Sequence, residues 1–210
     1  MTYEIAKKFW NNQKEYPHYP NLYERRLIDI NFVLNTIDNP KSLLDIGCSD
    51  GYLIRILKEL TNIEVFYAID LSKKAINYLT KNWKYNDVKL IANSGSVLEK
   101  HLHEADVITS MGLFPYIFEI NDLNLLLSKI KTDLFIVRIP CTLKDQDEYV
   151  NTYSKELKAN YSSIYRTVNN YKNIFKEFFK DIDIIKAYPD EIESKYGTKH
   201  FFFVCKKRLF

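Results

Sequence analysis

Two glycines and two aspartates near the start of the chain have the types and spacing of a ligand-binding edge. Gly47 and Gly51 follow an apolar run that contains Asp45, and Asp70 ends the next apolar run. Glycine lets a backbone turn tightly and lets a ligand approach closely. The helix that begins after Gly51 would add free N–H groups and a positive dipole end. The loop therefore looks like a nucleotide-ligand fingerprint, although Ser49 stands where a glycine would be expected.

The loop does not fit a diphosphate ligand. In the dinucleotide fingerprint G-x-G-x-x-G, aligned on Gly47, the second and third glycines would fall at Ser49 and Tyr52. The chain also lacks a G-x-x-x-x-G-K-[ST] phosphate loop, and Asp45 would repel a pyrophosphate. These departures argue against a dehydrogenase.

The elements that must position these residues alternate along the chain. Apolar runs predict strands, and apolar residues at i, i+3, i+4 spacing predict helices between them. Such alternation indicates parallel βαβ units in a sheet covered on both faces, with a final pair of strands that is plausibly antiparallel. The predicted strands are 42–46, 64–69, 88–92, 106–110, 134–139, 182–187 and 200–205, and the predicted helices include 73–83, 122–131 and 171–179.

The segment D-I-G-C-S-D-G at residues 45–51 resembles motif I of the class I S-adenosylmethionine-dependent methyltransferases, with Ser49 in place of the middle glycine. The resemblance continues at Asp70, the acidic residue that ends the second apolar run. The resemblance spans about residues 40–206 and implies S-adenosylmethionine as cofactor. It also implies an α/β, doubly wound, seven-stranded Rossmann-like sheet of order 3-2-1-4-5-7-6, with strand 7 antiparallel and helices on both faces.

The resemblance also implies which residues contact the cofactor. Asp45 suits the ammonium group, Asp70 the ribose hydroxyls, and Leu71 the adenine. Ser96 stands where the family often has an aspartate that bonds the adenine amino group, which leaves that bond open. The full set of expected cofactor residues is Asp45, Gly47, Cys48, Ser49, Gly51, Asp70, Leu71, Ser96, Val97, Ser110 and Met111.

Candidates for the acceptor side are spread along the chain. His200 and Tyr116 are the candidate catalytic residues, since transfer to oxygen needs a proton acceptor. Arg138, inside an apolar strand, must find a partner; a role in the site and an exposed edge position both remain open. Glu191 and Glu193 are expected to be exposed. The candidate substrate-binding residues are Tyr19, Tyr23, Arg25 and Arg138.

Composition limits the class of protein. The 210 residues, 46% of them hydrophobic, suit one domain, residues 1–210, with 1–40 as an N-terminal helical cap and 141–180 as a substrate-side insertion. Three widely spaced cysteines indicate neither a disulfide framework nor a metal site and fit a cytoplasmic protein. No apolar run approaches the roughly 20 residues of a membrane helix.

The expected activity is methylation of a small-molecule or sugar-like acceptor, with oxygen as the expected atom. A net charge of +3 does not predict a polyanion partner. The stretch SMGLFPY lacks the Asp/Asn-Pro-Pro-aromatic motif of nucleic-acid amine methylases, so DNA is not expected as a partner. An RNA or protein methyltransferase and a catalytically silent cofactor-binding module remain alternatives, and the sequence leaves the oligomeric state open.

Overall fold

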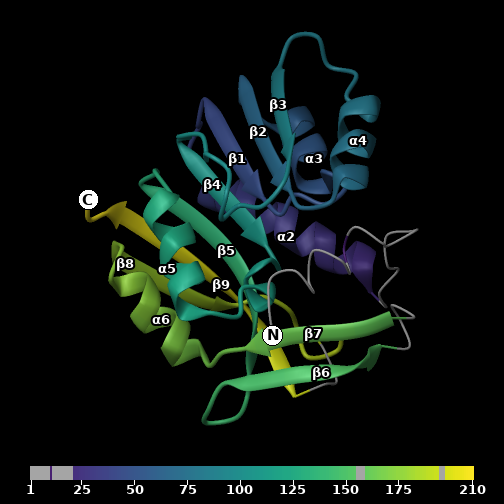
Figure 1. The fold of residues 1–210 in the computed structure, drawn as a ribbon. Coiled ribbons are helices and arrows are strands. Elements are labelled where there is room, and N and C mark those ends of the chain that lie inside the picture. The colour runs from purple at the N-terminus through teal and green to yellow at the C-terminus, as the bar shows by residue number, and fades with distance from the viewer. Residues whose placement is uncertain (1–9, 11–20, 155–158, 194–196) are drawn as a thin grey trace.

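A seven-stranded sheet forms the centre of the molecule in a computed structural model that describes residues 10, 21–154, 159–193 and 197–210 (Figure 1). Its order is β3-β2-β1-β4-β5-β9-β8. All neighbours are parallel except β9, which runs antiparallel to both β5 and β8. The strands are β1 Ser42–Ile46, β2 Val65–Asp70, β3 Lys89–Ser94, β4 Val107–Met111, β5 Leu134–Thr142, β8 Phe179–Lys186 and β9 Thr198–Arg208.

This topology confirms the predicted fold, with β8 and β9 as the sixth and seventh strands of the sheet. Within this sheet, the main differences from the predicted strands lie at the strand ends. The last parallel strand and the final strand are longer than predicted because Leu134 through Thr142 pair continuously with Lys206 through Thr198. Cross-strand hydrogen bonding continues through polar residues that carry no apolar signal in the sequence.

Helices cover both faces of the sheet, as expected for parallel βαβ units. Helices α2 (Leu22–Thr36), α3 (Tyr52–Leu60) and α4 (Lys73–Asn82) pack on one face, and α5 (Ile120–Lys129) and α6 (Val168–Lys176) on the other. Helix α6 begins at Val168, where the Thr167 side chain accepts a hydrogen bond from the Asn170 N–H, rather than at the predicted residue 171. None of the helices in the described part of the chain is both long and apolar enough to cross a membrane.

A two-stranded hairpin, absent from the predicted elements, lies beside the main sheet (Figure 1). It consists of β6 (Glu148–Ser154) and β7 (Ala159–Tyr165), paired antiparallel. Tyr149 and Tyr153 are exposed, which explains why the region lacks the alternating apolar pattern of a half-buried strand. Arg166, directly after β7, is buried and donates hydrogen bonds to the carbonyls of Ile117 and Phe118, so the hairpin is anchored near the end of β4.

Side-chain alternation places three polar residues on the same face of neighbouring strands. Leu43 packs toward α2 and α3 whereas Leu44 packs toward α5. Asp45 therefore projects to the α2 side. Thr109 of β4, its register partner, and Arg138 of β5 project to the same side. The apolar strands thus carry a polar row at the carboxyl edge of the sheet, where ligands bind in open α/β folds.

Candidate active site

The loop after β1 has a backbone that glycine makes possible. Gly47 and Gly51 have φ of +75° and +74°. A Cβ atom at Gly51 would lie 2.4 Å from Leu79 Cδ1, so even an alanine would collide with α4. Ser49 also adopts a left-handed conformation, with φ of 53°, which costs a non-glycine residue some energy. The serine therefore keeps the backbone shape of the glycine that it replaces.

Asp70 joins this loop to the end of β2. One carboxylate oxygen accepts the Ser49 N–H at 2.8 Å, and the other accepts the Ser72 N–H at 2.8 Å. Burial raises the pKa of Asp70, and these two N–H groups offset part of that effect. The carboxylate thus fixes the loop and lies at the edge where the ribose was expected.

Asp45 is buried beside this loop, and among the described residues no cation pairs with it. Its side chain accepts a hydrogen bond from the Thr109 hydroxyl at 2.8 Å. Burial raises the pKa of Asp45 to about 7; the Thr109 bond opposes this, and the negative charges of Asp70 and Asp29 add to it. A site rich in buried carboxylates favours a ligand with positive groups and disfavours a phosphate.

The other expected cofactor residues line the same edge, but several use their side chains elsewhere. Cys48 and Val97 are buried, whereas Leu71 and Met111 are half-buried. The Ser110 hydroxyl donates to the Ile46 carbonyl and ties β4 to β1. The Ser96 hydroxyl accepts the N–H of Leu98 within its own turn.

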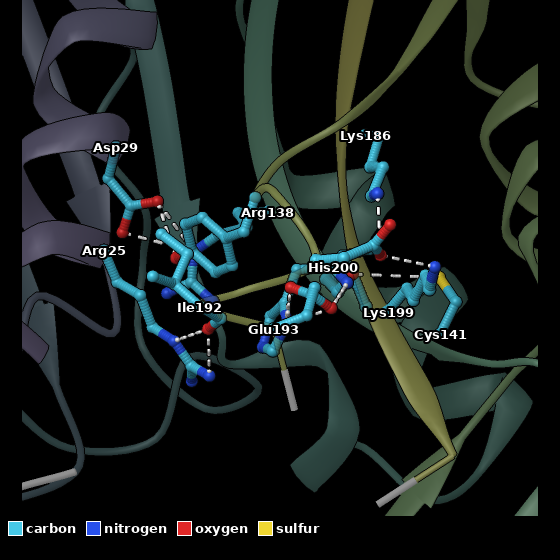
Figure 2. A network of polar contacts seen from close by, with 12 residues as sticks. Arg25, Asp29, Arg138, Cys141, Lys186, Ile192, Glu193, Lys199 and His200 are labelled. Atoms are coloured by element: carbon cyan, nitrogen blue, oxygen red, sulfur yellow. Dashed lines mark hydrogen bonds and ion pairs between the residues drawn. The ribbon is translucent and has the colours of Figure 1, made fainter. Parts of the chain in front are cut away.

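Arg138 is the centre of a buried polar cluster. The sequence predicted that this arginine needs a partner but did not identify the partner. Its Nε lies 2.9 Å from Asp29 Oδ1, and the side chain is 13% exposed (Figure 2). Asp29 of α2 also accepts the hydroxyls of Tyr52 and Tyr188, at 2.8 and 3.0 Å. Burial lowers the pKa of Arg138, but Asp29 and the two phenols reverse this, so the net shift is upward. The arginine therefore stays charged, with Asp29 as the partner it required.

Asp29, Tyr52 and Tyr188 were missed as site residues. For Asp29 a signal existed: it lies four residues before the buried Val33, on the face of α2 that packs against the sheet. An acidic residue on such a face needs a cation, and Arg138 was the unexplained cation. Tyr52 and Tyr188 carry no comparable signal, because only folding brings them to Asp29.

The remaining substrate candidates fall in different places. Arg25 donates to the Ile192 carbonyl at 3.0 and 2.7 Å, and its guanidinium lies 5.4 Å from the Tyr188 ring centre. Tyr23 is 71% exposed and projects into solvent. Tyr19 lies outside the described residues.

The two candidate catalytic residues lie near the carboxyl edge. Tyr116 is half-buried in the short 3-10 helix Phe114–Tyr116 after β4, and its ring meets Trp10 edge-on at 5.2 Å. His200 of β9 is buried opposite Pro140, and its Nδ1 lies 3.0 Å from Glu193 Oε1 (Figure 2). The prediction that Glu193 is exposed was wrong: its side chain is 3% exposed because it folds inward to bond His200. Glu191 is exposed, as expected.

Comparisons with known proteins agree with this geometry. Residues 43–134 match a family model described as a methyltransferase domain. A comparison with curated proteins finds no significant match.

The fold recurs in solved structures of low sequence identity. An S-adenosylmethionine-dependent methyltransferase from Clostridium acetobutylicum is 15% identical, with a TM-score of 0.63 over 89% of this chain and 94% of that one. Geranyl diphosphate C-methyltransferase from Streptomyces coelicolor is 10% identical, with a TM-score of 0.67 over 97% of both chains. Magnesium protoporphyrin IX methyltransferase from Synechocystis is 12% identical, with a TM-score of 0.63 over 97% of both chains.

These structures establish the shared fold, and the family match covers the segment that carries the glycine loop, Asp45 and Asp70. The seven-stranded order with its antiparallel strand is the one that the resemblance implied. Together, the comparisons show that residues 43–134 resemble a methyltransferase domain and that the chain shares its fold with solved S-adenosylmethionine-dependent methyltransferases.

Proposed function

We propose that the protein transfers the methyl group of S-adenosylmethionine to an oxygen of a small-molecule or sugar-like acceptor. The observation that carries the cofactor assignment is the pair of carboxylates on either side of the left-handed loop, buried Asp45 and half-buried Asp70. Arg138 is bonded to Asp29 and leaves these two charges uncompensated among the described contacts. A ligand that carries an ammonium and a sulfonium but no phosphate fits this charge.

Each residue of the loop then has a defined role toward the cofactor. Asp70 would accept the ribose hydroxyls while it holds the loop through Ser49. Asp45 would face the ammonium group, directly or through water. Bound S-adenosylmethionine supplies an electrophilic methyl group, so the chain must orient the acceptor, exclude water and remove a proton where the acceptor carries one.

The acceptor side supports a small polar molecule. Arg138 lies midway along β5, level with the end of β4, Tyr116 lies in the 3-10 helix after β4, and His200 lies near the start of β9. We assign these residues, with Arg25, to this side of the site. Oxygen is the proposed atom because a buried histidine with a carboxylate partner can take a proton, which a neutral amine acceptor would not require. The related structures act, by name, on acceptors as different as geranyl diphosphate and magnesium protoporphyrin, so the fold leaves the acceptor open.

The alternatives make different demands on the surface. An RNA methyltransferase needs a basic groove. Lys206, Lys207 and Arg208 form the compact basic cluster of the sequence. Lys206 pairs with Asp183 at 2.8 Å and Lys207 with Asp181 at 2.7 Å, so two of these three charges are already balanced. A silent cofactor-binding module would bind the cofactor and transfer nothing, and only an activity measurement separates it.

Calorimetric titration with S-adenosylhomocysteine tests the cofactor assignment. We expect binding by the wild type and a loss of about 10- to 150-fold in affinity for Asp70→Ala, the range for a hydrogen-bonded charged group. Asp87→Ala, at an exposed aspartate paired with Lys58, is the matched control and should bind as wild type does. Absence of binding by the wild type contradicts the proposal, and equal binding by Asp70→Ala contradicts the ribose role.

A panel of hydroxyl, amine and thiol compounds with methyl-labelled cofactor then tests the acceptor atom. Transfer to hydroxyl compounds is expected. Transfer to amines alone would contradict the proposed atom but leave the cofactor assignment intact.

A further inference from the structure

His200 is held by two separate bonds to one carboxylate. Its imidazole Nδ1 lies 3.0 Å from Glu193 Oε1, and its backbone N–H donates to Glu193 Oε2 at 2.9 Å. The two side chains are 10% and 3% exposed (Figure 2). The backbone bond places the carboxylate, and the Nδ1 contact then orients the imidazole ring, so this buried pair differs from a chance surface contact.

The carboxylate decides which ring nitrogen carries the proton. An ionised glutamate can only accept hydrogen bonds, so the facing Nδ1 must be the N–H of a neutral imidazole. The lone pair then lies on Nε2, on the far side of the ring. Within the described residues, the hydrogen bonds of this imidazole are made by Nδ1 alone. Nε2 therefore keeps a lone pair that no described residue uses.

The surroundings keep the ring neutral. Burial lowers the pKa of His200, Glu193 raises it, and the positive charges of Arg138 and Arg25 lower it further, with a net downward shift. The centre of the Tyr188 ring lies 5.0 Å from the centre of the imidazole ring. The guanidinium groups of Arg25 and Arg138 lie 5.4 and 5.6 Å from the centre of the Tyr188 ring. An imidazole that is neutral at pH 7 is in the form that accepts a proton.

We propose that Glu193 and His200 act as one unit in which His200 Nε2 takes the proton of a hydroxyl acceptor and Glu193 positions the ring. This inference rests on the proposed methyl transfer to oxygen. The acceptor oxygen bonds the methyl carbon while the carbon–sulfur bond breaks, with its electron pair going to sulfur. The acceptor's proton passes to Nε2, and Glu193 balances the resulting imidazolium charge until water removes the proton.

The location of the pair suits this role. His200 of β9 pairs with Pro140 of β5. Pro140 lies two residues beyond Arg138, and Arg138 pairs with Met111 at the end of β4. His200 therefore lies outside the carboxyl end of β4, past the glycine loop and on the acceptor side. Glu193 acts only through His200 and is a positioning residue.

Nuclear magnetic resonance and chemical modification test the pair without any acceptor. In 15N-labelled protein, with the His200 signals assigned from His200→Gln, we expect the Nδ1–H tautomer at pH 7. Diethyl pyrocarbonate should modify His200 at Nε2, as located by mass spectrometry. An Nε2–H tautomer, or a His200 that stays unmodified while the protein is folded, would overturn the proposal, because a purely structural pair needs no accessible lone pair.

Substitution of Glu193 supplies the second arm. Glu193→Gln should lower the pKa of His200 measured by resonance, and Glu193→Asp should restore part of it. Glu191→Gln, at the exposed glutamate two residues away, should change nothing. With a hydroxyl acceptor, Glu193→Gln should reduce kcat about 10- to 100-fold and leave KM for the cofactor unchanged.

The outcomes separate this inference from the proposed function. If the wild type binds no S-adenosylhomocysteine, the proposed function fails whatever the tautomer. Suppose that the wild type binds S-adenosylhomocysteine and transfers methyl groups to hydroxyls, while Glu193→Gln keeps full kcat and an unchanged pH profile. The proposed Glu193–His200 unit is then wrong, and the proposed function stands.

Discussion

The cofactor edge and the acceptor edge of the same sheet are built in different ways. The cofactor edge comprises the ends of β1 and β2 with the intervening loop. The loop is held by contacts within one βαβ unit, those of Asp70 with Ser49 and Ser72. The proposed acceptor edge comprises the second half of β5, the start of β9, α2 and the loop before β9. Its contacts join distant segments, such as Arg138 with Asp29 and Arg25 with Ile192.

This difference separates two kinds of constraint. At the cofactor edge, backbone shape decides the site, so glycines and a loop-holding carboxylate are required whatever the acceptor. At the acceptor edge, side chains from separate elements meet, so their chemistry can change without changing the loop. The related structures are consistent with that division, because they share the fold yet are named for different acceptors.

The largest expected effect tests whether the acceptor edge also holds the fold together. Asp29→Asn leaves the buried Arg138 without its counter-charge, and breaking a buried pair costs about 3–5 kcal/mol in the free energy of unfolding. Urea denaturation measures this loss. Glu24→Gln, at an exposed position on the same helix, is the control and should unfold as wild type does. A small loss for Asp29→Asn would mean that the cluster matters for ligands rather than for stability.

A matched pair of glycine substitutions tests the cofactor edge. Gly51→Ala combines a left-handed backbone with a Cβ 2.4 Å from Leu79, whereas Gly197→Ala has the same φ, +73°, with no atom within 4 Å. We expect a loss of about 1 kcal/mol for Gly197→Ala from backbone strain alone. Gly51→Ala should lose about 2–4 kcal/mol, because overpacking adds to the strain. Thermal unfolding and S-adenosylhomocysteine binding measure both variants.

If the two alanine variants lose equal stability, the loop has room that the structure does not show. Only Gly51→Ala should also weaken ligand binding, since Gly197 lies in the loop before β9 and outside the cofactor edge.

The smallest expected effect is a pH dependence at Asp45. Its pKa of about 7 in the folded protein exceeds that of an unfolded aspartate. The folded state therefore binds more protons between about pH 4 and 7, and the stability of the free protein should fall as pH rises through that range. A cationic ligand needs the ionised carboxylate. Affinity for S-adenosylmethionine should thus rise about tenfold, roughly 1.4 kcal/mol, from pH 6 to pH 8.

Calorimetry across this pH range checks the prediction, with Asp45→Asn as the comparison. The asparagine cannot ionise, so the variant should bind more weakly and lose the tenfold dependence while the ligand's own titration remains. An identical pH profile in both proteins would show that Asp45 does not face the ammonium group.

Much of the cofactor half could be predicted from sequence because its signals are local. Asp45, Gly47, Gly51 and Asp70 lie in one βαβ unit, and the alternation of apolar runs with helical periodicity orders the strands around them. Ser49 in place of the motif's middle glycine did not prevent the prediction, because one left-handed non-glycine residue costs little free energy. The hairpin β6–β7 was missed because its strands pair with each other and Tyr149 and Tyr153 of β6 are exposed.

The sequence by itself determined the sheet, the glycine loop and the two carboxylates, and it marked Arg138 as a charge in need of a partner. Only the tertiary structure decided that the partner is Asp29, that Tyr52 and Tyr188 complete the cluster, and that Glu193 turns inward to His200. The physical reason is distance along the chain. Backbone shape follows from neighbouring residues, whereas a buried charge is balanced by whichever side chain folding brings within a few ångströms.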